Sequence, residues 1–165
     1  MITMGITLSE LLADNEAATA KWQAWFTDNP AALDAPCDIY NSGTVRGLIQ
    51  HIFDRELRHA SRLAGSDAAM REPTPTDTVE QIFAAHAQAV DHLRGFLAQT
   101  NDAALHEIIA IPTVSAGTLQ ASRRKLFVHV MLHSIRHWAQ LSTHLRTHGY
   151  KTAWPKDFLM SEAMQ

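Results

Sequence analysis

Two histidines, His133 and His137, stand four residues apart in segment 127–148, which reads FVHVMLHSIRHWAQLSTHLRTH. Residues at this spacing lie on one face of an α-helix, about one turn from each other, so both imidazoles can reach the same atom. This spacing is typical of metal ligands. A zinc site that keeps an open coordination position needs three protein ligands. Another part of the chain must therefore supply the third ligand.

The best candidate for the third ligand is His51, on the flank of the apolar stripe of another predicted helix. Three histidines from two helices form a set of neutral donors that suits zinc or nickel and leaves a position for water or substrate. The pair is not the HExxH motif of zinc proteases, because Ser134 follows His133 where that motif has glutamate. A histidine pair on an apolar helix is also compatible with a purely structural role.

A rival metal site begins with Glu56 and His59, which form a Glu-x-x-His motif. Di-iron helical bundles use this motif twice and add glutamates from two other helices. Neither Glu80 nor Glu107 is followed by a histidine at the required spacing. The di-iron alternative lacks half of its ligands, and the three-histidine site is the favoured hypothesis.

Four long amphipathic segments must position these residues, and together they predict an all-α four-helix bundle. Each predicted helix follows a residue that can cap its first turn, and the first has a capping box, Thr7 with Glu10. The predicted helices run from about Leu8 to Phe26, from Thr44 to about Ala64, from about Thr78 (capped by Thr76 or Asp77) to Leu97, and from Ser122 to Gly149.

The connecting segments are predicted to be less regular. Turn-forming residues make 31–43 a loop, and 100–120 is expected to be an extended hairpin or an ordered loop over one end of the bundle. A short docked turn or helix is expected after Pro155. Trp22, Trp25 and Trp138 are interpreted as core or dimer-interface anchors. Trp154 and Phe158 could form the wall of a cleft instead.

Composition limits the class of protein. The 165 residues carry a formal charge of −3, which argues against a nucleic-acid-binding surface, and residues 1–165 are expected to form a single domain. A single cysteine, Cys37, excludes an internal disulfide. The first residues do not resemble a signal peptide, and no apolar run is long enough for a membrane span. We therefore expect a cytoplasmic protein.

Several segments are similar to one known family. They are TVRGLIQ before His51, HIFDRELRHASRLAG, and HVMLHSIRHWAQLSTHLRTHGY followed by WPKDFL. Together these segments resemble the DinB/YfiT-like superfamily of metal-dependent proteins, which is distinct from the lesion-bypass DNA polymerase of similar name. The resemblance implies a four-helix bundle with up-down-down-up connections, a homodimer, and a divalent metal held by His51, His133 and His137.

The resemblance also implies two kinds of function. Similar proteins include transferases and isomerases that depend on a low-molecular-weight thiol, so the first hypothesis is metal-dependent thiol transfer to a small-molecule substrate, with hydrolysis as a related chemistry. The alternative is a non-catalytic metal-binding or stress-response interaction module.

Supporting roles at the site are assigned from the residue types. Glu56 is a candidate acid or base, and the alternative is a buried or capped carboxylate in an ion pair with Arg55, Arg58 or Arg62. Gln140 could orient a ligand or water, or only form a hydrogen bond to a neighbouring helix. His129 could orient a ligand histidine or act as a fourth donor. Arg123 and Arg124 could bind the anionic end of a thiol cofactor or pair with acidic groups. The remaining histidines are expected at the surface or the edge of the core.

Overall fold

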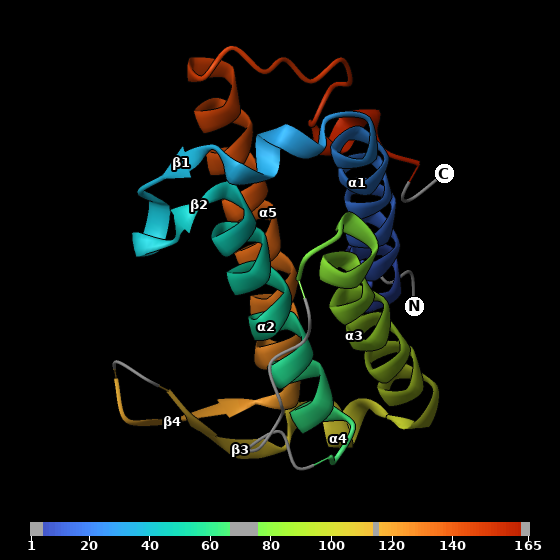
Figure 1. The fold of residues 1–165 in the computed structure, drawn as a ribbon. Coiled ribbons are helices and arrows are strands. Elements are labelled where there is room, and N and C mark those ends of the chain that lie inside the picture. The colour runs from blue at the N-terminus through green and yellow to red at the C-terminus, as the bar shows by residue number, and fades with distance from the viewer. Residues whose placement is uncertain (1–4, 67–75, 114–115, 163–165) are drawn as a thin grey trace.

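The computed structural model describes residues 5–66, 76–113 and 116–162 (Figure 1). In these ranges the chain is mostly helical, with five α-helices and two small antiparallel sheets. The helices are α1 (Leu8–Asp28), α2 (Val45–Leu63), α3 (Val79–Gln99), α4 (Asp102–His106) and α5 (Arg123–Thr147). The strands are β1 (Pro36–Cys37) paired with β2 (Gly43–Thr44), and β3 (Ile108–Pro112) paired with β4 (Thr118–Ser122). Short 3-10 helices cover Pro30–Asp34, Ile39–Asn41 and Phe158–Met160.

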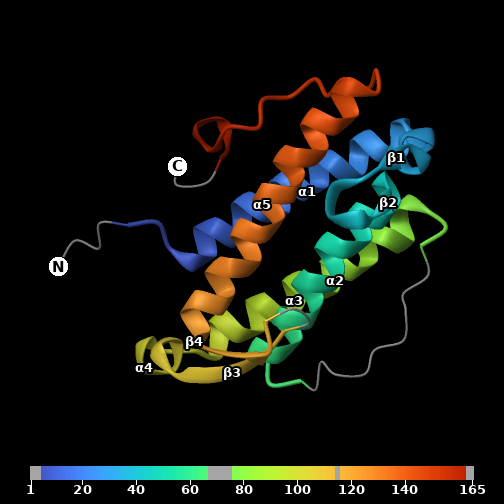
Figure 2. The same cartoon turned by 90° about the vertical axis from the view of Figure 1, so that its left-hand side faces the viewer.

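The four longer helices lie side by side. When the colour bar is followed in Figure 1, α1 and α5 run in one direction and α2 and α3 in the other. Helix α2 packs against both α3 and α5, and the β3–β4 hairpin and α4 lie at one end of these helices (Figures 1 and 2). None of the helices in the described ranges combines the length and apolar character needed to cross a bilayer.

Side-chain caps set where the long helices begin. Thr7, Thr44 and Ser122 each accept a hydrogen bond from a backbone N–H in the first turn of α1, α2 and α5, as predicted. The cap of α3 was predicted wrongly: Thr78, not Thr76 or Asp77, caps it and forms a capping box with Gln81. The hairpin expected within 100–120 is present as β3 and β4. Helix α4 and the β1–β2 pair were not predicted.

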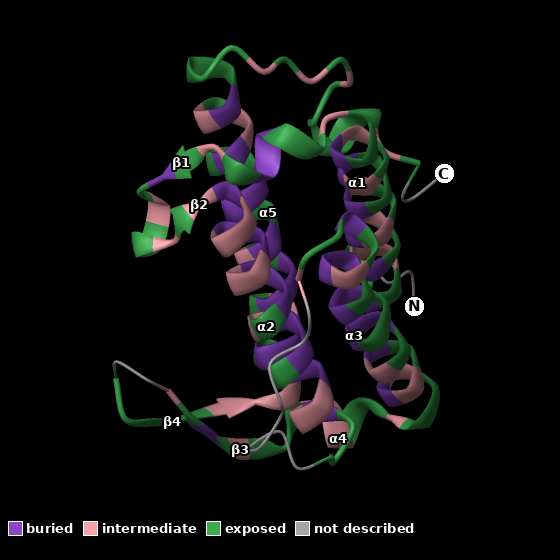
Figure 3. Ribbon diagram, in the orientation of Figure 1, coloured by how far each residue is buried: buried purple, intermediate pink, exposed green. Residues whose placement is uncertain are grey.

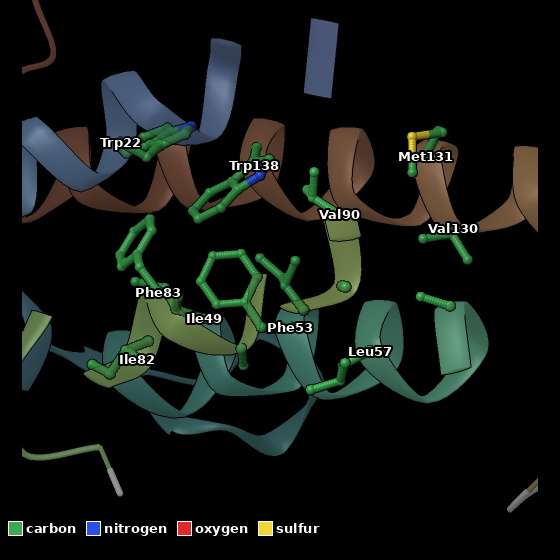
Figure 4. Close-up of a cluster of buried hydrophobic side chains, with 14 of the residues drawn as sticks. Trp22, Ile49, Phe53, Leu57, Ile82, Phe83, Val90, Val130, Met131 and Trp138 are labelled. Atoms are coloured by element: carbon green, nitrogen blue, oxygen red, sulfur yellow. The ribbon is translucent and has the colours of Figure 1, made fainter. Parts of the chain in front are cut away.

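The core lies between the long helices, and their buried faces point inward (Figure 3). At its centre Trp22 stacks on Trp138, with ring centroids 5.1 Å apart, and Trp138 also packs against Phe53 and Phe83 (Figure 4). Offset aromatic contacts of this kind add to the stabilisation from buried area. Trp22 and Trp138 are therefore core residues, and they fix the relative positions of α1 and α5.

Candidate metal centre

The three predicted ligands come together where α2 packs against α5. His51 is on α2, and His133 and His137 are one turn apart on α5. The ring centroids are 5.2 Å apart for His51 and His133, 5.1 Å for His51 and His137, and 4.5 Å for His133 and His137. One ligand nitrogen from each ring lies within 4.8 Å of the other two, so the group could hold a metal ion.

Two nitrogens of this group are buried without a hydrogen-bond partner among the residues described. They are Nε2 of His51 and Nδ1 of His133. Buried polar atoms nearly always have a partner, so two unpaired ring nitrogens in one cluster need an explanation. A cation bound by their lone pairs would satisfy both, and imidazole nitrogen is a preferred ligand of zinc and nickel. The residues present therefore fit a divalent metal.

The third ring is oriented by Gln140. Nδ1 of His137 donates a hydrogen bond to Oε1 of Gln140, at 2.7 Å. Because an amide oxygen can only accept, Nδ1 carries the proton and Nε2 keeps a free lone pair. Metal-binding histidines usually donate their other N–H in this way, which fixes the ring and the tautomer. Gln140, predicted to orient a ligand, has the contact this role requires.

This contact predicts the effect of Gln140→Ala. The variant leaves Nδ1–H of His137 without its acceptor, so the ring loses its fixed orientation. Loss of such an orienting partner typically costs about 10–100-fold in metal affinity. Competition against a fluorescent zinc chelator measures the change. Gln140→Glu, which keeps an acceptor, should bind zinc at least as tightly as the parent chain. Equal affinity of Gln140→Ala and the parent would contradict this role.

The environment keeps the three imidazoles neutral. Burial, followed by the neighbouring His137 and Arg55, lowers the pKa of His51 to about 4. Burial and the other histidines of the cluster lower the pKa of His133 to about 3. Burial also lowers the pKa of His137, although its hydrogen bond to Gln140 opposes the change. Protons therefore compete weakly for these nitrogens near neutral pH.

The lowered pKa values predict how the stability of the metal-free chain depends on pH. His51 and His133 bind protons near pH 6.5 when unfolded but only near pH 4 and 3 when folded. Below pH 6.5 the unfolded chain holds more protons, so the free energy of unfolding should fall as pH decreases. Urea unfolding between pH 7.5 and 5.5 measures the slope. His133→Gln should have a shallower slope, and an unchanged slope would contradict the assignment.

Tyr40 is a residue of the site that the sequence interpretation missed. Its ring lies over His51 with centroids 4.0 Å apart, and 6.2 Å from His137. Its backbone has φ 55°, in the left-handed region that costs a non-glycine residue about 1–3 kcal/mol. The β1–β2 pair closes this loop, and the loop approaches α2 so closely that a Cβ at Gly47 would collide with the carbonyl oxygen of Ser42. The fold thus holds Tyr40 against the histidines.

Glu56 is buried in the core, and its hydrogen bonds in the described part of the chain go to residues other than the three histidines. It is 1% exposed. Oε1 accepts hydrogen bonds from Asn15 Nδ2 at 2.9 Å and Ser134 Oγ at 2.6 Å, and Oε2 accepts one from His86 Nδ1 at 2.7 Å. The burial in the alternative interpretation is confirmed, but the ion-pair partner in the described part of the chain is His86 and not an arginine of α2. His86, expected at the surface or the edge of the core, is a buried partner of this carboxylate.

Of the other candidate residues, His129 lies next to the histidine cluster, and Arg123 and Arg124 lie at the start of α5. The ring of His129 is 5.8 Å from that of His133 and 5.7 Å from that of His59, but its nitrogens are not in the converging group. Arg123 pairs with Glu107 at 2.9 Å, as the ion-pair alternative predicted. Arg124 is exposed beside it at the start of α5. Ten residues separate Arg123 from His133, which is about 15 Å along the helix axis.

Trp154 and Phe158 line a cavity of about 280 Å³ between α1, α5 and the C-terminal segment. Trp22 and Trp138 also line it, and Nζ of Lys156 lies 4.5 Å from the centre of the Trp154 ring. None of the three converging histidines is among the lining residues. The two aromatic residues therefore wall a cavity separate from the histidine cluster.

Comparison with known proteins identifies the family of the chain. No curated protein matches the chain. A family model described as the DinB family matches residues 3–164, nearly the whole sequence. The match covers His51, His133 and His137 together with every described helix and strand. The chain belongs to the DinB family.

Proposed function

We propose that this chain is a metal-dependent protein that uses zinc or nickel to activate a low-molecular-weight thiol for transfer to, or isomerisation of, a small-molecule substrate. The scaffold proposed is the up-down-down-up four-helix bundle, as a homodimer. The observation that carries the proposal is the convergence of three neutral imidazoles, two of them with unpaired buried nitrogens. A metal held by neutral ligands keeps its full charge and would supply Lewis acidity that lowers the pKa of a thiol.

The chain's own residues have defined tasks in this proposal. His51, His133 and His137 would hold the ion, and Gln140 fixes the ring of His137. Tyr40 covers one face of His51, which limits approach to the site from that side. In a transfer reaction the thiol sulfur forms a bond to an electrophilic carbon, the bond to the leaving group breaks, and the thiol proton passes to solvent.

A thiol-conjugation assay tests the proposal. The zinc- or nickel-loaded chain is mixed with 1-chloro-2,4-dinitrobenzene and, in turn, with glutathione, cysteine, bacillithiol and mycothiol, and release of chloride and formation of the thioether are followed. We expect metal-dependent turnover with at least one thiol, and none with His133→Ala. Normal metal binding without turnover of any thiol would contradict the proposed chemistry.

One observation favours a non-catalytic metal-binding module as the second candidate. Among the described residues, no carboxylate is hydrogen-bonded to the three histidines, and Glu56 is held in the core by three other side chains. Hydrolysis, which usually needs a general base, is therefore less well supported than thiol transfer. A chain that binds metal at the cluster but turns over neither thiols nor esters would favour this second candidate.

A further inference from the structure

A row of arginines extends from the histidine cluster along α2. Arg55, Arg58 and Arg62 follow His51 by four, seven and eleven residues, so all lie on the same face of the helix. At 1.5 Å per residue they lie about 6, 10 and 16 Å from His51 along the helix axis. The NH1 group of Arg62 is 3.2 Å from Nδ1 of His59, which places its guanidinium on the same face.

Helix α5 adds positive charge from the other side. The ring centroid of His59 on α2 is 5.7 Å from that of His129 on α5, and the centroid of His129 is 5.8 Å from that of His133. His129 therefore lies between the arginines of α2 and the histidine cluster. Arg136 follows His129 by seven residues and His133 by three on α5, so it lies on the same face of that helix. After burial, its charge is the next cause that lowers the pKa of His129. We call Arg55, Arg58, Arg62 and Arg136, with His59 and His129, the basic strip.

The basic strip has no carboxylate partner within the described part of the chain. The arginines found in ion pairs there are Arg46, Arg94 and Arg123, which are not in the strip. The charges that affect His59 all lower its pKa and come, after burial, from His129 and from Arg62, Arg55 and Arg58. Within the described residues these four arginines form no ion pair, and their like charges repel one another unless an anion is bound.

We propose that the basic strip binds a small organic anion with at least two negative charges, such as a di- or tricarboxylate, whose reactive end lies at the three histidines. Guanidinium groups bind carboxylates through paired N–H donors, and the strip offers them about 6 to 16 Å from His51. Only the placement of the reactive end rests on the proposed function. Anion binding itself requires no metal.

The length of the strip favours a small anion over a nucleic acid. Its arginines span about 10 Å along α2, from Arg55 to Arg62. Nucleic-acid-binding domains usually have a broader basic surface and a basic overall charge, whereas this chain is acidic overall. A co-substrate thiol or an electrophile that carries two or three carboxylates has the matching size and charge.

Calorimetry on the metal-free chain tests the inference without any assay of activity. The probes are propane-1,2,3-tricarboxylate and, as a phosphate source, inorganic pyrophosphate. We expect saturable binding of the tricarboxylate that weakens as salt increases. The double substitution Arg55→Gln with Arg136→Gln should weaken binding by about tenfold or more, because charge-assisted hydrogen bonds are lost. Tighter binding of pyrophosphate would identify a phosphate-bearing ligand for the same strip.

Control variants make the result specific. Arg146→Gln removes an exposed arginine of α5 outside the strip and should change affinity less than twofold. Because Arg55 is half-buried, Arg58→Gln with Arg136→Gln provides a second pair in which both arginines are exposed. No binding of either anion by the parent chain, or equal losses in Arg146→Gln and both pairs, would overturn the inference. So would tighter binding of a single-stranded oligonucleotide than of either anion.

Zinc titration of the same variants separates this inference from the proposed function. Removing positive charge near the histidines should leave zinc binding unchanged or tighter. Zinc binding at the histidines without anion binding would refute the basic strip as an anion site and leave the metal site standing. Anion binding without zinc binding at the histidines would refute the metal site and leave the basic strip standing as an anion site.

Discussion

Replacing His133 with alanine should abolish stable zinc or nickel binding by this chain. His133 is one of the three converging rings, and its centroid is 4.5 Å from that of His137 and 5.2 Å from that of His51. Without it only two protein ligands remain, fewer than zinc sites use. The loss in affinity should exceed the roughly 100-fold upper range found when only an orienting partner is removed. Mass spectrometry of metal content after loading and desalting measures it.

Matched variants make this prediction specific to the cluster. His51→Ala and His137→Ala should lose metal as His133→Ala does, because each removes one of the three converging nitrogens. His106→Ala, which changes an exposed histidine on α4, should keep the metal content of the parent chain. Full metal content in all three cluster variants would place the metal elsewhere. Circular dichroism shows whether each variant is folded.

The converging histidines were predictable because helical spacing carries most of the information. The four-residue separation of His133 and His137 places them on one face of α5. His51 was identifiable because it lies on the flank of an apolar stripe and so at the edge of a helix-helix contact. Tyr40 was not predictable in this way. It reaches His51 through a left-handed turn in a loop, and no periodicity in the sequence indicates such a conformation.

The long helices were predictable for a similarly local reason. Thr7, Thr44 and Ser122 cap their own helices through hydrogen bonds to residues three positions later, so the relevant signal is close in sequence. The short elements depend on distant partners. Each strand of the β1–β2 pair has only two residues, and α4 has five. Elements this short are determined by tertiary contacts more than by their own sequence.

The partners of Glu56 were not predictable from its neighbours on the same helix. Nearby arginines on the same helix suggested an ion pair, but Glu56 is one position after Arg55, about 100° around the helix. It falls instead on the buried stripe that contains Ile52, Phe53 and Leu57. A carboxylate in such a stripe must find donors from other helices, because a buried charge without partners is very unfavourable. Its position among apolar residues was the signal for a buried network.

The network around Glu56 predicts a large loss of stability for Glu56→Ala. Its three partners come from three other helices: Asn15 from α1, His86 from α3 and Ser134 from α5. Removing the carboxylate leaves the buried donors of Asn15 and His86 without their acceptor and opens a cavity, and Ser134 keeps only the carbonyl oxygen of Val130. We expect the free energy of unfolding to fall by about 3–5 kcal/mol, as is typical when one partner of a buried charged network is removed.

Urea unfolding at pH 7.5 measures this loss, and Glu56→Gln provides the matched control. Glutamine fills nearly the same volume and keeps one oxygen that can accept from Asn15 and Ser134, so it should lose clearly less stability than alanine. Asn15→Ala removes only one donor and should cost about 1–2 kcal/mol. A loss below about 1 kcal/mol for Glu56→Ala, within the range of ordinary surface substitutions and small core changes, would mean that Glu56 does not hold the four helices together.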